Sequence, residues 1–182
     1  MVYQINFFGP VHQLSVQNFY MACNDVINKG ATKLIIAISS SGGDAVGGLS
    51  VYNYLRTLKI PIQTINYGTV ASSAVYIYLA ADERITLYDA KFAFHEFTTT
   101  LNTGEYKANT LYEKYLFLKK EFELYSRIVK SRTNFSEIDN CFGGQEVILS
   151  AHKAVDLGIA HTICVPEDLS TEGIEIIQLP TI

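Results

Sequence analysis

The sequence has no run of basic residues and only modest charge of either sign. Of its 182 residues, 18% are charged, and the formal net charge at pH 7 is −4. Proteins whose main partner is nucleic acid usually carry a basic patch or stripe. The sequence therefore does not predict binding to nucleic acid.

Long apolar runs are also missing. The longest, Ala74 to Ala81, is far shorter than the roughly 20 residues that a membrane-spanning helix needs. The first residues, MVYQINFFGPV, lack a positive region followed by a long apolar core, so they predict no secretory signal. The three cysteines, Cys23, Cys141 and Cys164, have no metal-like spacing, and their odd number argues against a closed disulfide framework. We expect a cytoplasmic protein with no membrane partner.

Apolar residues make up 48% of the chain, and this length suits one domain with a substantial core. Short apolar runs alternate with helical patterns, which predicts parallel βαβ units and an α/β fold. The expected strands are Ile5–Phe8, Lys33–Ser39, Pro61–Asn66, Arg84–Leu87 and Phe92–His95. The expected helices among them are Leu14–Ile27, Ala45–Leu58 and Ser72–Ala81.

A polar, Thr-rich stretch, Glu96–Gly104, precedes a long expected helix from about Glu105 to Ser131. Apolar residues recur along this helix at spacings of three and four, as Leu111, Tyr115, Leu118, Phe122, Tyr125 and Val129. Others, such as Tyr112 and Phe117, lie off this stripe, so we expect an oligomer contact as well as contact with the domain itself. The alternative is a helix that only crosses its own sheet.

Beyond the long helix, the pattern becomes weaker. Ser136 and Ser150 are expected to cap two short helices, and Gly158 to end the second. The tail after Pro166 carries no clear pattern.

Three segments carry residues that could perform chemistry. In the glycine-rich turn SSSGGDAVGG, Ser39 to Gly48, backbone amides could approach an anion closely. In Tyr67 to Ala81, Ser72 or Ser73 stands where a buried helix starts, either as an exposed nucleophile or simply as a cap. His95 ends an apolar strand, where a histidine is either structural or a general base.

These segments all follow strand ends, and the carboxyl ends of parallel strands share one edge of a sheet. A serine needs an adjacent base to become nucleophilic at neutral pH, and histidine is the usual base. We therefore expect a hydroxyl, an imidazole and amide donors to converge.

Taken together, these segments resemble the proteolytic subunit of Clp protease. The family's Ser-Pro-Gly-Gly turn corresponds to Ser40-Ser41-Gly42-Gly43, and its Gly-x-Ala-Ala-Ser turn to Gly68-Thr69-Val70-Ala71-Ser72. His95 follows at the expected distance, and the segment Ser150 to Ile163 resembles the family's Ser-Ala-x-x-Ala-x-x-x-Gly-Leu-Val-Asp. Ser41 in place of proline and Val70 in place of alanine are departures that remove no reacting group.

The resemblance implies a crotonase-like ββα superhelix with a long protruding handle helix. It implies one domain over 1–182, with a head at about 1–95 and 132–165, a handle at about 96–131 and a tail at 166–182. It also implies stacked homo-oligomeric rings that enclose a chamber, in which peptides or unfolded proteins are cleaved.

The resemblance implies a serine peptidase with Ser72 as nucleophile, His95 as general base and the amides of Gly43 and Ser73 as oxyanion hole. Alignment on Ser150 puts Glu146 where the family has its orienting aspartate, with Asp139 as an alternative. No metal or organic cofactor is implied. Alternative functions are a non-catalytic ring subunit and a crotonase-type enzyme acting on an acyl-CoA.

The family also has an N-terminal segment that lines an axial pore and engages a hexameric ATPase. The sequence begins almost at its first expected strand. Docking of a Clp-type ATPase therefore does not follow from the resemblance.

Overall fold

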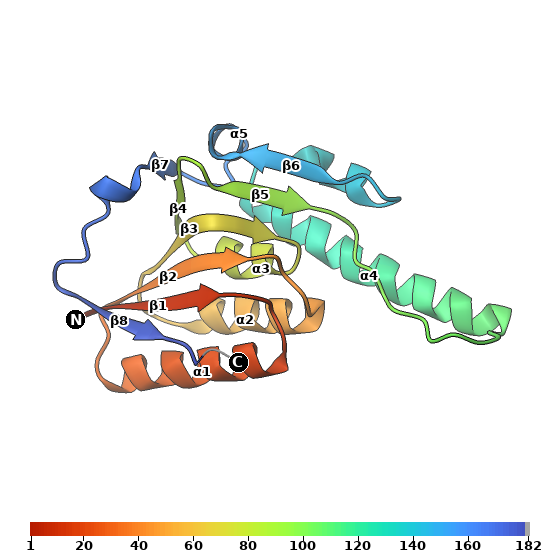
Figure 1. Ribbon diagram of the computed structural model, residues 1–182, viewed down its shortest axis with the longest axis horizontal. Coiled ribbons are helices and arrows are strands. Elements are labelled where there is room, and N and C mark those ends of the chain that lie inside the picture. The colour runs from red at the N-terminus through yellow and green to blue at the C-terminus, as the bar shows by residue number, and fades with distance from the viewer. Residues whose placement is uncertain (181–182) are drawn as a thin grey trace.

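The expected strands, with three short strands that were not predicted, form one eight-stranded sheet in the computed structural model, which describes residues 1–180 (Figure 1). Its order is β6-β5-β3-β2-β1-β8, while β4 pairs with β3 and β7 pairs with β4. All pairs are parallel except the antiparallel pair of β5 and β6. The strands are β1 (Val2–Phe8), β2 (Lys33–Ser40), β3 (Ile62–Ala71), β4 (Glu83–Leu87), β5 (Lys91–Phe94), β6 (Val147–Ser150), β7 (Thr162–Cys164) and β8 (Ile174–Gln178).

Strand β3 is longer than predicted and changes its partner along its length. Its first part, from Gln63 to Asn66, pairs with β4, and its last three residues, Thr69 to Ala71, pair with β5. An irregularity in the pairing with β2 coincides with this switch. As a result, Ala71 lies beside Ala93, which brings the residues that follow β3 close to those that follow β5.

Helices pack on this sheet through buried apolar faces. They are α1 (Gln13–Asn28), α2 (Ala45–Thr57), α3 (Ala74–Leu79), α4 (Ala108–Arg132) and α5 (Ala151–Asp156), with the 3-10 helices η1 (Ser136–Cys141) and η2 (Pro166–Asp168). Every residue of α3 is buried, as expected for a fully apolar helix. None of the helices within residues 1–180 combines the length and apolar character that crossing a membrane requires.

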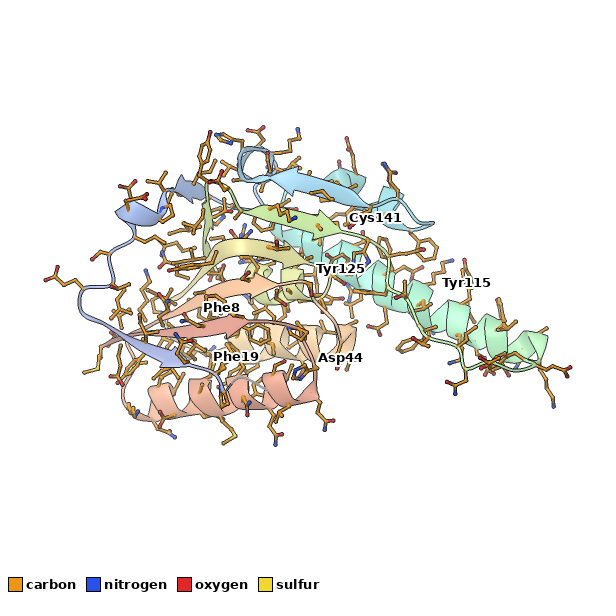
Figure 2. All side chains as sticks on the ribbon, in the orientation of Figure 1. Phe8, Phe19, Asp44, Tyr115, Tyr125 and Cys141 are labelled. Carbon is orange, nitrogen blue, oxygen red and sulfur yellow. The ribbon has the colours of Figure 1, made fainter. Side chains whose placement is uncertain are left out.

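Helix α4 is half inside and half outside the domain. Figure 1 shows its first half projecting away from the sheet, and Figure 2 places Tyr115 on this projection and Tyr125 where the helix meets the sheet. Phe122, Tyr125 and Val129 are buried, whereas Leu111 and Tyr115, which belong to the same predicted stripe, are exposed. The expected handle-like helix is therefore present, and the domain itself covers only the later part of the stripe.

Arg84 at the start of β4 holds several chain segments together. Its guanidinium is buried and donates to the carbonyl oxygens of Ala81, Arg132, Gly158 and Ile159 at 2.8–3.0 Å. Burial lowers the pKa of this group to about 10. The four acceptors lie at or just after the C-terminal ends of α3, α4 and α5, so one side chain ties the ends of these three helices together.

The predicted caps and ends of the shorter helices are only partly confirmed. Ser150 caps α5 by accepting from the amide of Lys153, and Gly158, at φ +66°, follows its end, so both predictions are confirmed. The cap at Ser136 is wrong, because Phe135 holds the N-cap position of η1 and no side chain caps it. In the tail, β8 pairs with β1; residues 181–182 lie outside the described part of the chain.

Candidate active site

The three segments singled out in the sequence meet at one cleft. It has a volume of about 470 Å³ and lies where β2, β3 and β5 end. The glycine-rich turn, Ser72 and His95 all line it, together with residues of the loop after β5 and of α4. The lining residues are Ser41, Gly42, Gly43, Asp44, Ala45, Val46, Ser72, His95, Phe97, Thr98, Phe117, Leu118 and Glu121.

Ser72 occupies a sharp turn between β3 and α3. Its φ of +52° is the only positive value of a non-glycine residue within residues 1–180, and such a left-handed conformation costs about 1–2 kcal/mol. The turn is held from both sides. The amide of Ser72 donates to the carbonyl of Ala93 at 3.0 Å, and its carbonyl accepts from the amide of Val75 at 3.0 Å and the hydroxyl of Tyr125 at 3.3 Å.

Neither serine at this turn acts as a side-chain cap. Ser73 is the N-cap residue of α3, yet its hydroxyl makes no capping hydrogen bond, and its Oγ is buried without a partner among residues 1–180. Ser72 Oγ likewise has no hydrogen bond with any residue of the described chain. The capping alternative is therefore not supported, and the strained backbone at Ser72 presents its side chain at the cleft.

His95 follows β5 and is half-buried in the same cleft. Its Nδ1 lies 2.6 Å from the carbonyl oxygen of Glu96. A carbonyl can only accept, so Nδ1 carries a proton in this arrangement, and in the neutral imidazole Nε2 is then the nitrogen with a free lone pair. This is the tautomer that a general base requires. Within residues 1–180, no hydrogen bond joins His95 to Ser72.

Gly42 and Gly43 form the tight part of the turn after β2. Two hydrogen bonds with Val11 fix this turn. The Val11 amide donates to the carbonyl oxygen of Gly42 at 2.9 Å, and the Asp44 amide donates to the carbonyl oxygen of Val11 at 2.8 Å. Gly43 has φ +144°, and a Cβ there would lie 2.2 Å from the Val11 carbonyl oxygen, so no other residue fits. The amides of Gly43 and Ser73, the two predicted oxyanion donors, have no acceptor among the residues described.

Glu146 lies one residue before β6 and is exposed. The last pair of the β5–β6 ladder joins Phe94 to Val147, so one further antiparallel pair would set His95 opposite Glu146. The carboxylate makes no hydrogen bond to His95 in the described structure; the carbonyl of Glu96 takes the Nδ1 position instead. Backbone register thus favours Glu146 as a neighbour of His95, without a contact between the side chains.

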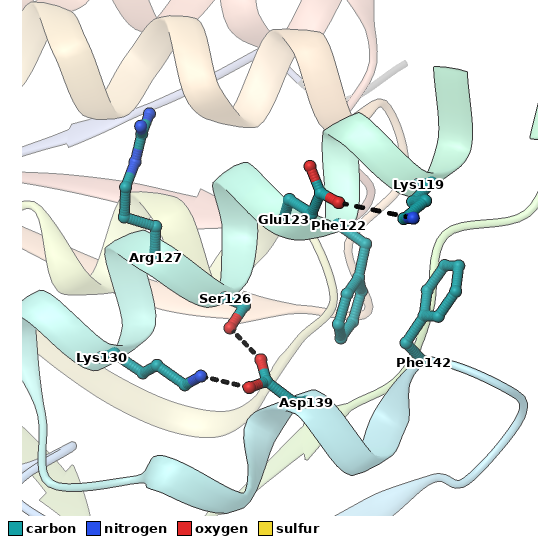
Figure 3. Close-up of a pocket in the computed structure, with 8 residues that line it drawn as sticks. All are labelled: Lys119, Phe122, Glu123, Ser126, Arg127, Lys130, Asp139 and Phe142. Atoms are coloured by element: carbon teal, nitrogen blue, oxygen red, sulfur yellow. Dashed lines mark hydrogen bonds and ion pairs between the residues drawn. The ribbon is translucent and has the colours of Figure 1, made fainter. Parts of the chain in front are cut away.

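Asp139 lies elsewhere, in a second cleft of about 550 Å³ that shares no lining residue with the first (Figure 3). It accepts from Ser126 Oγ at 2.5 Å and pairs with Lys130. These two hydrogen bonds, that of Lys130 first, hold the pKa of the Asp139 carboxyl below its usual range. The structure does not bring Asp139 to His95.

The sequence did not identify several residues that belong to this site. Glu121 lines the cleft from α4, and Tyr125 holds the Ser72 carbonyl from the same helix. Glu96 fixes the loop after His95, since its carboxylate accepts from the Gly143 amide at 2.9 Å. Tyr125 was visible as part of an apolar stripe, but no local pattern marks Glu121 or Glu96.

Comparison with known proteins shows the family to which this chain belongs. The sequence model of the Clp protease family matches residues 26–167, which is most of the chain. The chain belongs to the Clp protease family. It is similar to the ATP-dependent Clp protease proteolytic subunit 2 of Treponema denticola, with 41% identity over 69 residues, 36% of this chain and 34% of that protein.

The subunit of the same name from Borreliella burgdorferi is 35% identical over 65 residues, which are 35% of this chain and 33% of that protein. The chain thus aligns with only about a third of the length of these curated relatives. Among solved structures, a mutant of ClpP1 from Listeria monocytogenes superposes with a TM-score of 0.78 at 20% identity, covering 91% of this chain and 92% of that one. This likeness confirms the predicted crotonase-like α/β fold.

Proposed function

We propose that the protein is a serine endopeptidase with Ser72 as nucleophile and His95 as general base. The observation that carries this proposal is the convergence of Ser72, His95 and Gly43 on one cleft, with the amides of Gly43 and Ser73 free of other acceptors within the described chain. Membership of the Clp protease family supports peptide hydrolysis as the reaction.

In this mechanism, Ser72 Oγ attacks the carbonyl carbon of the scissile peptide bond while Nε2 of His95 takes its proton. The carbonyl oxygen becomes an oxyanion, to which the amides of Gly43 and Ser73 donate; losing one such donor typically costs about 2.7–4 kcal/mol of transition-state stabilisation. His95 then returns the proton to the leaving amine, and water hydrolyses the acyl-enzyme by the same steps. A serine–base hydrogen bond often tightens only with substrate in place.

As the orienting carboxylate we propose Glu146, because the strand register sets it opposite His95 and Asp139 is engaged in a separate cleft. For assembly we propose stacked homo-oligomeric rings in the cytoplasm, through the exposed first half of α4. The substrate would be a peptide or unfolded protein, extended beside the loop of residues 96–107, which carries no strand and could pair by strand addition.

A second candidate is a ring subunit of the same fold without activity. The observation that favours it is the lack of a hydrogen bond from His95 to Ser72 or Glu146 among residues 1–180. The curated relatives are named ATP-dependent. Adding a Clp-type ATPase to the peptidase assay therefore tests whether such an ATPase is a partner of this protein.

Hydrolysis of a fluorogenic peptide by the assembled protein distinguishes these candidates. We expect turnover by the parent protein and a loss of roughly 10³-fold or more in Ser72→Ala and in His95→Ala, as for other catalytic triads. Glu146→Gln should lose rate as well, and Asp139→Asn should not. An intact assembly without turnover would select the inactive subunit.

A further inference from the structure

An acidic side chain without a partner lies in the wall of the candidate active site. Glu121 reaches the cleft of Ser72 and His95 from α4. Its Oε2 is shielded from solvent and has no hydrogen-bond partner in the described structure. Buried polar atoms of this kind are rare in native proteins and call for an explanation.

A polar group that interacts with Glu121 offers only part of that explanation. The hydroxyl of Tyr76 on α3 is also buried and unpartnered among residues 1–180. Burial raises the pKa of Tyr76, and the negative charge of Glu121 raises it further, so the two groups interact electrostatically. No hydrogen bond joins them, however, and the Glu121 carboxylate is left without a counter-charge.

The cleft as a whole carries negative charge. Asp44 and Glu121 both line it, while neither lysine nor arginine does. Asp44 uses Oδ1 to cap α2 through the Val46 amide at 3.1 Å, so part of its charge is already engaged. Glu121 is the acidic group of this wall whose carboxylate has a shielded oxygen with no hydrogen bond in the described structure.

The other walls of the cleft are apolar and aromatic. Phe97, Phe117 and Leu118 line it beside Glu121. A lysine or arginine side chain needs such an environment, since its aliphatic stem packs on apolar surface while its charged head meets a carboxylate. An apolar side chain would fill the same walls but leave the shielded Oε2 of Glu121 without a hydrogen bond, which costs free energy.

We propose that this cleft receives a lysine or arginine side chain of the substrate, with Glu121 as its counter-ion. The inference rests on the proposed function, because the residue it selects is the one whose carbonyl Ser72 attacks. Glu121 is then a specificity-determining residue that touches the substrate and takes no part in proton transfer.

The test is a panel of fluorogenic peptides that differ only in the residue before the reporter group: Lys, Arg, Leu, Phe or Glu. We expect the parent protein to show its highest kcat/KM with Lys or Arg. Glu121→Gln keeps the size and removes the charge, so the ratio of kcat/KM for Lys over Leu should fall by roughly 30-fold or more, the lower range for losing one member of a buried charge pair. The matched control is Glu123→Gln, two residues along the same helix, whose exposed carboxylate faces Lys119 in the second cleft.

A parent protein that prefers Leu or Phe, with a ratio unchanged in Glu121→Gln, would overturn the inference. So would a preference for Lys or Arg that Glu121→Gln retains, which would leave Glu121 as a structural neighbour of Tyr76. In both cases turnover that depends on Ser72 leaves the proposed function intact, whereas turnover that survives Ser72→Ala removes both.

A second readout needs no variant and so does not depend on how Glu121→Gln folds. A fluorophosphonate probe that reacts at Ser72 should be slowed by benzamidine, a small cation, and not by benzamide, which is neutral and of the same shape. Equal effects of the two compounds would contradict a counter-ion in the cleft.

Discussion

At Ser72, the backbone conformation is set by contacts on three sides. The Ala93 carbonyl, the Val75 amide and the Tyr125 hydroxyl hold the turn, and a Cβ on Gly42 would lie 2.7 Å from the Ser72 Cβ. These neighbours fix a left-handed residue that would otherwise relax. Residues held in a strained backbone conformation by their surroundings are concentrated at active sites, and Ser72 fits that description.

Replacing Ser72 by alanine and by glycine separates strain from chemistry. Both variants lose the hydroxyl, so both should lose hydrolysis. Ser72→Gly also removes the left-handed penalty and should be more stable than Ser72→Ala by about 1 kcal/mol, measured by urea unfolding. Equal stabilities would mean that residue 72 is not strained.

Residue patterns predicted part of this site. Gly43, Ser72 and His95 stand out because each follows an apolar strand, and the structure does bring them to one cleft. Glu121 and Arg84 could not be found this way. Their surroundings include residues far away in the sequence, as for Arg84, whose acceptors include Arg132 and Gly158, and no local period encodes such contacts.

At the scale of elements, the partner switch of β3 positions the site. Its final three residues pair with β5, which places Ser72 and His95 at neighbouring strand ends. The sequence predicted β3 only to Asn66, because Tyr67-Gly68-Thr69 interrupts the apolar run. The short strands β6, β7 and β8 were missed, whereas β4 and β5, which are equally short, were predicted. At three to five residues a strand shows too little of a period to be found reliably.

The close approach of α2 to the turn at Ser73 is a second requirement. A Cβ on Gly48 would lie 2.6 Å from the Ser73 carbonyl oxygen. Gly48→Ala should therefore push the turn outward, lower stability by about 1–3 kcal/mol as overpacking does, and reduce hydrolysis by displacing the Ser73 amide. Thermal unfolding and the peptide assay report the two effects.

Gly47→Ala is the control on the same helix. The Cβ there would meet the ends of two side chains, Asp44 Oδ2 at 2.9 Å and Val16 Cγ2 at 3.2 Å, and no backbone atom. Small shifts of these side chains relieve the contacts, and alanine is the better helix former by about 1 kcal/mol. Stability should fall less than in Gly48→Ala. If Gly48→Ala behaved in the same way, close packing of α2 on Ser73 would not matter for the site.

At the scale of the whole molecule, the projecting half of α4 leaves large apolar side chains in solvent. Leu111, Tyr112, Tyr115 and Phe117 are each more than two-fifths exposed. An apolar surface of this kind typically marks a protein contact. The apolar stripe read from the sequence correctly predicted the helix, but it could not show which part of the stripe the domain itself would bury.

Light scattering on a sizing column tests the assembly. The parent protein should elute as a stacked oligomer, and the double variant Tyr112→Glu with Tyr115→Glu should have about half its mass. Lys120→Glu, which changes charge on the same helix at an exposed position, should leave the mass unchanged. A monomeric parent protein would contradict assembly through α4.

The mass of the protein after reaction with a fluorophosphonate, followed by peptide mapping, tests the central claim most directly. A nucleophilic Ser72 predicts one adduct per chain, located on Ser72 and lost in His95→Ala. An unmodified protein in an intact assembly, or an adduct on another serine, would contradict it.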